Sequence, residues 1–184
     1  DGASIDTSMG FTPLEGLVMG TRPGDLDPAI PLHLMAKQEM TPQEVSTLLN
    51  RHSGLYGISG ETNDMRSLLE SSRQGHERAR LAIEVFCYRL RKYIGAYTAV
   101  LGQVHGVIFT GGIGENAPHV RELSCGNMNA LGYDLDLEKN NRAVGAEAEI
   151  SAVSSRTRIY VIPTNEELLI ARDTYRVIEG IENP

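Results

Sequence analysis

A cluster of glycines after a short apolar run is the feature of this sequence that most suggests chemistry. The run Gly106–Thr110 predicts a buried strand, and residues 111–116, which read GGIGEN, lead from it into a predicted helix. Glycines let a backbone approach a ligand closely, and the unpaired N–H groups at a helix start attract anions. The arrangement therefore predicts a site for a phosphate or a nucleotide. It is not a Walker A loop, because no Lys followed by Ser or Thr comes after the glycines.

The same segment also fits a dinucleotide-binding fingerprint. Gly112, Gly114 and Ala117 match the pattern G-x-G-x-x-A, and Asp134 lies twenty residues after Gly114. An NAD-dependent dehydrogenase is therefore a rival hypothesis. The fingerprint normally opens its domain, whereas here a long predicted helix precedes it. A tight turn that only joins a strand to a helix is a third interpretation.

One arginine stands in a second glycine-rich segment, close to the start of the sequence. Arg22 lies between Gly20 and Gly24, on a predicted loop that can close over a ligand. A planar guanidinium in such a loop suits the recognition of phosphate or carboxylate. The alternative is a surface arginine without a chemical role.

Acidic residues open two of the predicted helices. Thr164 and Glu167 are spaced as a capping box, which would use Glu167 and leave Glu166 free to offer a hard oxygen to Mg²⁺. An acid at a helix start is also favourable without any metal, because it interacts with the helix dipole. Asp64 has the same ambiguity, since a helix is predicted to begin near Asn63 or Asp64 and the aspartate fits a cap.

Helices and strands alternate along the predicted framework that positions these residues. The strongest helix covers residues 76–102, where apolar residues recur at steps of three and four. A helix is predicted after Asp27, which would cap it, with Pro28 at its first position. A second begins at the capping box Thr41–Glu44 and runs to about 51. Two more are predicted, one from the glycine segment to about 131 and one from 164 to about 178. Strands are predicted at 106–110, 133–135 and 158–162. Residues 1–28 begin strand-like and then become glycine-rich, which predicts loop and turn structure, and a turn is predicted at 54–60. This alternation predicts an α/β layer fold with some parallel strands.

Composition and charge narrow the function classes. The 184 residues are 41% hydrophobic and 22% charged, which is ordinary for one globular domain, and the net charge of -7 argues against nucleic acid or an anionic membrane as a partner. No stretch has the ~20 apolar residues that a membrane span needs. Cys87 and Cys125 are expected to be reduced thiols, which indicates a cytoplasmic protein. The five histidines have no metal-ligand spacing.

Several longer motifs, in a fixed order, resemble the acetate kinase family, which comprises acetate and propionate kinases. They lie at residues 6–28, 60–66, 77–102, 109–116 and 161–167. Members of that family are about twice as long. The resemblance therefore implies that residues 1–184 form the C-terminal domain of a two-domain short-chain acid kinase whose N-terminal domain lies upstream.

The resemblance implies a fold and a reaction. The fold is the C-terminal lobe of an actin/hexokinase/Hsp70-like (ribonuclease H-like) architecture, a mixed sheet with flanking helices, with ATP bound between two lobes. The reaction is the reversible, in-line transfer of a phosphoryl group from ATP to acetate or propionate, giving ADP and an acyl phosphate, with Mg²⁺. A homodimer joined through this half is also implied.

Individual roles follow from matching the motifs. Arg22 corresponds to an arginine that stabilises the transition state, and Glu166 to a magnesium-linked glutamate. Nucleotide-binding positions are Asp64, Met65, Arg66, Gly111, Gly112, Ile113, Gly114 and Glu115. Other essential groups belong to the upstream half, so this chain alone is predicted to be inactive. A non-catalytic nucleotide-binding or dimerisation module remains the alternative to an enzyme half.

Overall fold

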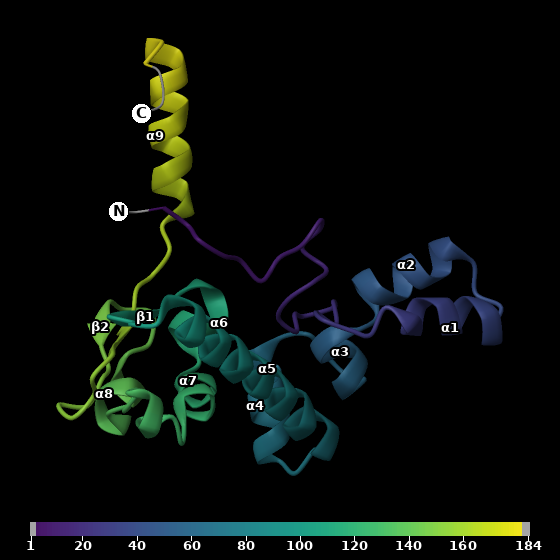
Figure 1. Ribbon diagram of the computed structural model, residues 1–184, viewed down its shortest axis with the longest axis horizontal. Helices are drawn as coiled ribbons and strands as arrows, with labels where there is room; N and C mark the ends of the chain where they lie inside the picture. Colours follow the sequence, from purple (N-terminus) through teal and green to yellow (C-terminus); the bar gives the residue numbers. More distant parts are fainter. Residues whose placement is uncertain (1–2, 182–184) are drawn as a thin grey trace.

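The computed structural model describes residues 3–181, and it confirms an α/β architecture with a small mixed sheet and flanking helices (Figure 1). The helices are α1 (Ala29–Lys37), α2 (Pro42–Arg51), α3 (Gly54–Ser59), α4 (Met65–Arg73), α5 (Glu77–Leu101), α6 (Gly111–Asn116), α7 (Pro118–Cys125), α8 (Leu137–Arg142) and α9 (Glu166–Glu179), with a 3-10 turn η1 (Asn129–Leu131). The strands are β1 (Gly106–Phe109), β2 (Ala148–Glu149) and β3 (Arg158–Val161).

The sheet has the strand order β1-β3-β2 within the described residues. β1 and β3 are parallel, with Phe109 opposite Val161, whereas β2 runs antiparallel to β3. Side chains on one face of the sheet, from Phe109, Ile159 and Val161, are buried, as expected from the alternation of side chains along a strand. The predicted strands at 106–110 and 158–162 are thus confirmed.

Helix α5 is the central element, and it confirms the helix predicted at 76–102. His76 caps its start by accepting a hydrogen bond on Nδ1 from the N–H of Ala79 at 3.1 Å. Its buried face packs against α3, α4 and α7. One core cluster lies between these helices, with the fully buried Leu55, Leu68 and Val120 at its centre. The C-terminal part of α5 reaches the second cluster, on the buried face of the sheet.

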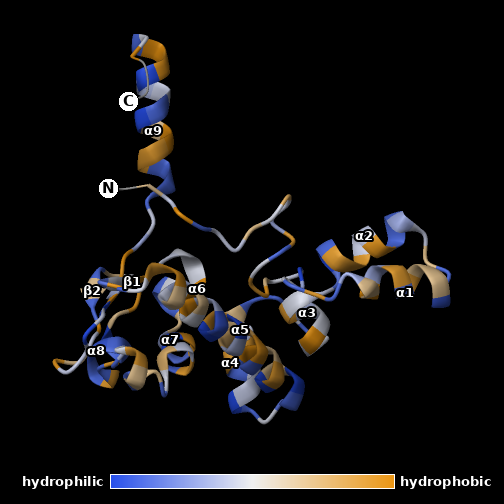
Figure 2. Cartoon of the chain, in the orientation of Figure 1, coloured by the Kyte–Doolittle hydropathy of each residue, from blue (hydrophilic) through white to orange (hydrophobic). Residues whose placement is uncertain are grey.

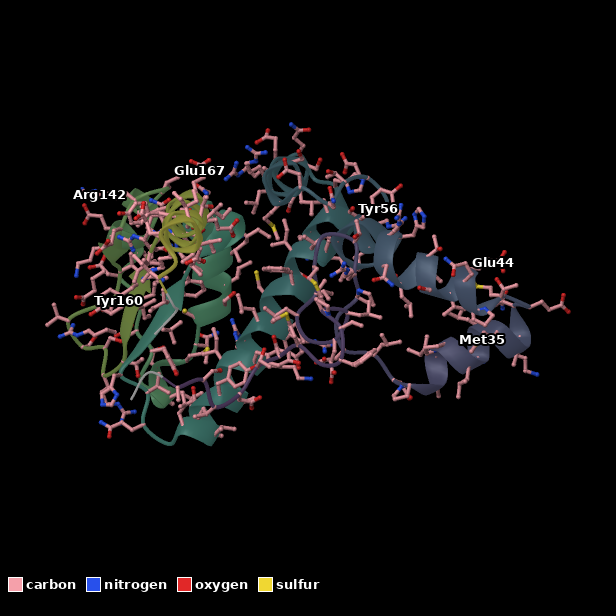
Figure 3. The ribbon with its side chains drawn as sticks, turned by 90° about the horizontal axis from the view of Figure 1, so that it is seen from above. Met35, Glu44, Tyr56, Arg142, Tyr160 and Glu167 are labelled. Atoms are coloured by element: carbon pink, nitrogen blue, oxygen red, sulfur yellow. The ribbon has the colours of Figure 1, made fainter. Side chains whose placement is uncertain are left out.

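Two parts of the chain project from this body. The α1–α2 hairpin, which carries Met35 and Glu44, lies at the opposite end of the molecule from Arg142 and Tyr160 (Figure 3). The predicted capping box of α2 is confirmed, since Thr41 Oγ1 accepts from the Glu44 N–H at 3.3 Å and Glu44 Oε2 from the Thr41 N–H at 2.7 Å. Helix α9 stands away from the sheet as a single helix (Figure 1), and it has no buried residue.

The structure corrects several predicted elements. Residues 3–28 form bends and turns, which confirms the loop and turn structure predicted for the glycine-rich part of this segment but not its strand-like start. Helix α3 (Gly54–Ser59) replaces the turn predicted at 54–60. Helix α1 begins one residue later than predicted, with Pro28 as its cap residue, although Asp27 Oδ1 still accepts from the Ala29 N–H at 2.9 Å. At 133–135 there is only an isolated bridge between Leu135 and Ser151.

The segment after β1 also differs from the prediction. The glycine segment is itself the helix α6, and the helix expected to continue to about 131 is divided into α6, α7 and η1. The division falls at Pro118, which has no N–H to donate and begins α7. Helix α8 and strand β2 were not predicted.

Both cysteines are free thiols in the interior of the fold, as expected. Burial raises the pKa of Cys87 to about 11 and that of Cys125 to about 12, so neither is a reactive thiolate near neutral pH. Among the described helices, none combines the length and the apolar character of a membrane span.

Candidate functional site

The glycine helix α6 starts where strand β1 ends, beside the end of β3. Because β1 and β3 are parallel, their carboxyl ends lie at the same edge of the sheet, and the Ile162 N–H donates to the Phe109 carbonyl at 3.0 Å. Helix α9 begins shortly after β3 at this same edge. Ligands of α/β proteins characteristically bind outside the carboxyl ends of parallel strands.

Glu115 ties the two connections at this edge together. Its Oε1 accepts hydrogen bonds from the Thr164 N–H at 2.8 Å, the Thr164 hydroxyl at 2.9 Å and the Gly111 N–H at 2.8 Å. These bonds, above all those from Thr164, lower the pKa of the Glu115 carboxyl. The carboxylate therefore anchors the start of α6 to the segment that leads into α9.

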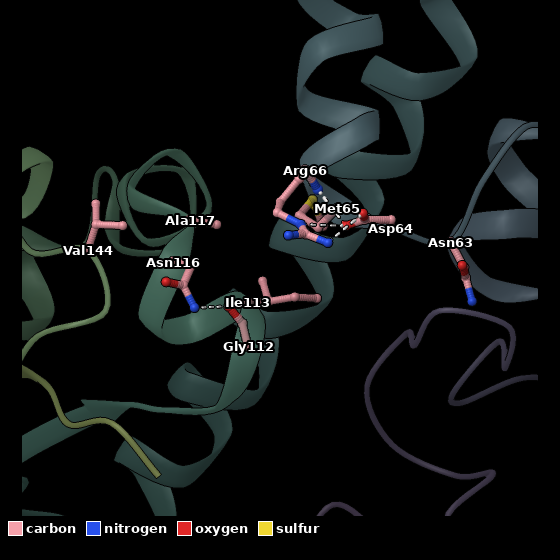
Figure 4. Close-up of a pocket in the computed structure, with 9 residues that line it drawn as sticks. All are labelled: Asn63, Asp64, Met65, Arg66, Gly112, Ile113, Asn116, Ala117 and Val144. Carbon is pink, nitrogen blue, oxygen red and sulfur yellow. Dashed lines mark hydrogen bonds and ion pairs between the residues drawn. The ribbon is translucent and has the colours of Figure 1, made fainter.

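A pocket of about 600 Å³ opens between the start of α4 and the helices α6 and α7 (Figure 4). Its volume is within the usual range for small-molecule sites. The lining residues are Asn63, Asp64, Met65, Arg66, Gly112, Ile113, Asn116, Ala117 and Val144. Five of the predicted binding residues, from two separate motifs, thus meet at one cavity.

The α4 wall of the pocket presents a helix N-terminus. Asp64 caps the helix by accepting the Arg66 N–H at 3.0 Å, and its other oxygen pairs with the Arg66 guanidinium at 3.0 Å. The bond from the Arg66 side chain is the largest cause that lowers the pKa of Asp64. The Arg66 side chain is 85% exposed, whereas Met65 is buried in the helical core. The capping role considered for Asp64 is therefore present.

The opposite wall comes from α6 and from a turn after α8. Asn116 Nδ2 donates to the Gly112 carbonyl at 3.0 Å, which stabilises α6 across one turn. Val144 reaches the pocket from the turn after α8, which is held to α6 by a bond from the Gly145 N–H to the Glu115 carbonyl at 3.2 Å. Sequence analysis did not single out Val144, because only the folded chain brings it to α6.

A fully buried arginine supports this wall from behind. The Arg121 guanidinium donates to the carbonyls of Gly114 (2.7 Å), Glu115 (3.1 Å), Asn140 (2.9 Å) and Ala143 (2.6 Å), and to Asn140 Oδ1 (2.8 Å). These carbonyls end α6 and α8, so the cation lies at the negative ends of two helices. Burial lowers the pKa of Arg121, but arginine stays protonated in proteins. Sequence analysis did not identify this residue.

Arg22 lies outside the pocket, on a segment that is fixed rather than free to close. Gly54 of α3 approaches this segment so closely that a Cβ atom would lie 2.3 Å from the Met19 carbonyl oxygen and 2.6 Å from that of Arg22. Gly54 also has a φ of 61°, which only glycine adopts readily. Within residues 3–181, the guanidinium of Arg22 has neither a hydrogen bond nor an ion pair. The backbone is therefore held while the charge stays available.

Glu166 is the first residue of α9 and is exposed. The predicted capping box is wrong, because the cap residue is Asn165, whose Oδ1 accepts from the Leu168 N–H at 3.0 Å, while Thr164 binds Glu115 instead. No cluster of three or more metal-ligating side chains occurs in the described part of the chain. A single free carboxylate still fits Mg²⁺, which retains water and substrate phosphates and needs only one or two protein carboxylates.

The structure thus divides the predicted residues into three groups. Asp64, Met65, Arg66, Gly112 and Ile113 line the pocket. Gly111, Gly114 and Glu115 belong to α6 but not to the pocket lining, and Arg22 and Glu166 lie on other segments. The nucleotide, metal and catalytic roles of all these residues remain predictions.

The geometry of a dinucleotide fingerprint is not reproduced. In that fold the acidic residue follows a strand parallel to the first strand. Here the parallel neighbour of β1 is β3, and Asp134 lies outside both strands, where it accepts hydrogen bonds from Asn129 and Ser154. The structure gives the dehydrogenase hypothesis no support.

Comparisons with known proteins agree with one another. The model of the acetokinase family matches residues 1–172. An acetate kinase of Halothermothrix orenii is 58% identical over 179 residues, which cover 97% of this chain and 45% of that protein. An acetate kinase of Thermotoga maritima is 51% identical over 98% of this chain and 45% of its own length. The chain thus spans about half the length of the relatives it matches.

Solved structures show the same fold. The crystal structure of Porphyromonas gingivalis acetate kinase superposes with a TM-score of 0.88 at 42% identity, covering 93% of this chain and 43% of that one. A propionate kinase from Francisella tularensis gives a TM-score of 0.87 at 43% identity, covering 94% of this chain and 44% of that one. The small mixed sheet with flanking helices is thereby consistent with the predicted actin/hexokinase-like lobe.

Proposed function

The chain belongs to the acetokinase family, and from that premise we propose that it is the nucleotide-binding half of an enzyme that phosphorylates a short-chain carboxylate with ATP. The observation that carries the proposal is the pocket between α4 and α6, where two separate family-like motifs meet. The acceptor is acetate or propionate, the product an acyl phosphate, and the reaction reversible. The enzyme is a cytoplasmic homodimer in this proposal, and the two reduced cysteines fit a reducing compartment.

The pocket is proposed to hold the adenosine part of ATP or ADP. Arg66 offers an exposed planar guanidinium, which can stack on a base, and Ile113 and Val144 offer apolar contacts. Gly111 and Gly112, where an added Cβ atom would meet nothing within 4 Å, leave room beside the pocket for the ribose and the phosphates. Glu115 acts as the anchor of α6, because its carboxylate oxygen is already bonded to Thr164 and Gly111.

Transfer of a phosphoryl group to a carboxylate needs positioning and charge neutralisation more than covalent participation of the protein. Arg22 is proposed to neutralise charge on the transferring group, because its guanidinium is unpaired within the described residues. Glu166 is proposed to hold Mg²⁺ directly or through water. Bound with ATP, the ion would screen the phosphate oxygens and help to orient the γ-phosphoryl group.

Residues 1–184 are proposed to be the C-terminal domain of a two-domain protein. Besides the length of the relatives, helix α9 supports this proposal. It exposes Leu169, Ile170, Val177 and Ile178, each with more than half of its surface accessible, and Figure 2 shows apolar stretches along it. Several exposed apolar side chains on a helix that buries none of its residues mark an interaction surface. We assign that surface to the upstream domain.

A hydroxamate assay tests the proposal. The complete polypeptide, with the upstream half present, is expected to form acyl hydroxamate from ATP, Mg²⁺ and acetate or propionate. The 184-residue chain alone is expected to form none above background, since the acyl site and other essential groups lie upstream. Inactivity of the complete, folded polypeptide with both acids would refute the function, and robust activity of the isolated chain would refute the division of the site.

A further inference from the structure

The segment that carries Arg22 is a closed loop with a narrow neck between Gly16 and Asp25. The Asp25 N–H donates to the Gly16 carbonyl at 3.0 Å, and the Gly16 N–H donates to Asp25 Oδ1 at 2.8 Å. A Cβ atom at Gly24, whose φ is 71°, would lie 2.3 Å from the Gly16 carbonyl oxygen. Two hydrogen bonds and close contact therefore hold the two sides of the neck together.

The neck is fastened to the central helix α5 through the same aspartate. Arg89 Nη1 donates to Asp25 Oδ2 at 2.6 Å, and its Nη2 to the Asp25 carbonyl at 3.3 Å. The Tyr93 hydroxyl donates to both carboxylate oxygens, at 2.8 and 3.0 Å. Arg89 and Tyr93 are four residues apart, so they lie on one face of the helix. We call Asp25, Arg89 and Tyr93 the neck clamp.

The carboxylate of the clamp is charged and only partly shielded from water. Burial opposes ionisation, but the bonds from Tyr93, Gly16 and Arg89 outweigh it and lower the pKa of Asp25. Burial, and then the bond to Asp25, raise the pKa of Tyr93 to about 12, so its hydroxyl remains a donor. The side chains of Arg89 and Asp25 are 24% and 37% exposed. Such a site can be altered without opening the core.

The opposite end of the loop is fixed by backbone bonds. The N–H groups of Leu55 and Tyr56 donate to the carbonyls of Met19 and Gly20, both at 2.9 Å. The Ser53 N–H donates to the Thr21 carbonyl at 3.0 Å. Both ends of the loop are thus anchored to the helical body, while the guanidinium of Arg22 has no partner among residues 3–181. This arrangement fixes the backbone that carries Arg22 before any ligand arrives.

We propose that Asp25 is a positioning residue for phosphoryl transfer, which acts through Arg22 by fixing the neck of its loop to Arg89 and Tyr93. The proposal rests on the function proposed above, because it needs Arg22 to serve the transferring group. Asp25 itself does not touch the reactants in this account. Loss of the clamp lowers kcat and leaves the affinity for ATP unchanged, since the nucleotide pocket is built from other elements.

A double-mutant cycle in the complete polypeptide tests the proposal. Arg22→Ala is expected to lower kcat ~10²-fold or more, as other charge-stabilising groups do. Asp25→Asn is expected to lower it about tenfold, because a small misplacement of a catalytic group is costly. In the Arg22→Ala background, Asp25→Asn is expected to have no further effect. If the two losses multiply, Asp25 does not act through Arg22 and the proposal is overturned.

A less disruptive variant separates a positioning role from a folding defect. Tyr93→Phe removes only the hydroxyl that binds Asp25, and the matched control Tyr88→Phe removes a hydroxyl from an exposed position of the same helix. Tyr93→Phe is expected to lower kcat at unchanged KM for ATP, with no effect once Arg22 is absent, while the control matches the wild type. A loss of ATP affinity in Tyr93→Phe would indicate a general structural role and overturn the proposal. If Arg22→Ala itself retains full turnover, the catalytic assignment of Arg22 fails first, and the role of Asp25 with it.

Discussion

Arg121 and Asp25 each hold one part of the proposed active site, but they do so in different surroundings. Arg121 is fully buried and binds only neutral acceptors at the ends of α6 and α8, directly behind the pocket. Asp25 is partly exposed and joins the Arg22 loop to the surface of α5. This difference in burial indicates that the two anchors have different roles. In the proposed enzyme the buried anchor would support both the fold and nucleotide binding, whereas the exposed anchor would support only the placement of the charge of Arg22.

Removal of the buried anchor should have the largest effect on stability. Arg121→Ala removes a donor from five acceptor atoms. The carbonyls of Glu115 and Asn140 keep bonds from the N–H groups of Gly145 and Ala143, but the other three acceptors lose their bond from the guanidinium, and each buried unsatisfied group costs about 1–3 kcal/mol. We expect the free energy of unfolding to fall by about 3 kcal/mol or more, and the affinity for ATP to fall with it. Chemical denaturation and calorimetric titration measure the two quantities.

The matched control for that experiment is Arg80→Ala, which breaks an exposed pair with Glu84 on α5. It should change stability by less than about 0.5 kcal/mol. Arg121→Lys keeps the charge but loses the planar set of donors, and it should fall between the wild type and Arg121→Ala. Equal stability of the Arg121→Ala and Arg80→Ala variants would show that the pocket wall does not depend on the buried cation.

Removal of the Glu115 carboxylate should have a smaller effect on stability than removal of Arg121, and this effect should depend on pH. The pKa of its carboxyl is lowered in the folded chain, so its contribution to stability is present above the unfolded value of about 4.3 and is lost as the pH falls through the folded value. Glu115→Gln should therefore lower Tm near pH 6, and the difference from wild type should shrink below about pH 4.

Thermal unfolding across pH 3–7 measures this effect, with Glu147→Gln as an exposed control. A difference between wild type and Glu115→Gln that stays constant over this range would contradict the role of the ionised carboxylate as the link between α6 and Thr164.

Sequence patterns predicted the parts of the molecule that depend on local interactions. The α5 helix, the Thr41 capping box and the strands β1 and β3 follow from periodicity and short-range capping, and the structure confirms them. The Asp64 cap is equally local. For such elements the residues that decide the conformation lie within a few positions of each other in the chain.

Tertiary contacts explain what the sequence did not predict. Glycines at 54, 57 and 60 suggested a turn, but Gly54 begins a helix because the Arg22 loop packs against it. Thr164 was expected to cap α9, and instead it binds Glu115, so Asn165 takes that role. Arg121 was not identified, because an arginine in an amphipathic helix normally points to water. Val144 gave no signal, since it approaches α6 only in the folded chain.

Binding of ATP to the 184-residue chain tests the central claim most directly, because this chain is proposed to contain the adenosine pocket but not the whole catalytic site. Calorimetric titration with ATP and Mg²⁺ should show saturable binding at one site, and NADH should show none. Ile113→Glu, in the pocket, should abolish binding, whereas Val153→Glu, at a position that is 94% exposed, should not. A folded chain that fails to bind ATP, or that binds NADH in preference, would contradict the account.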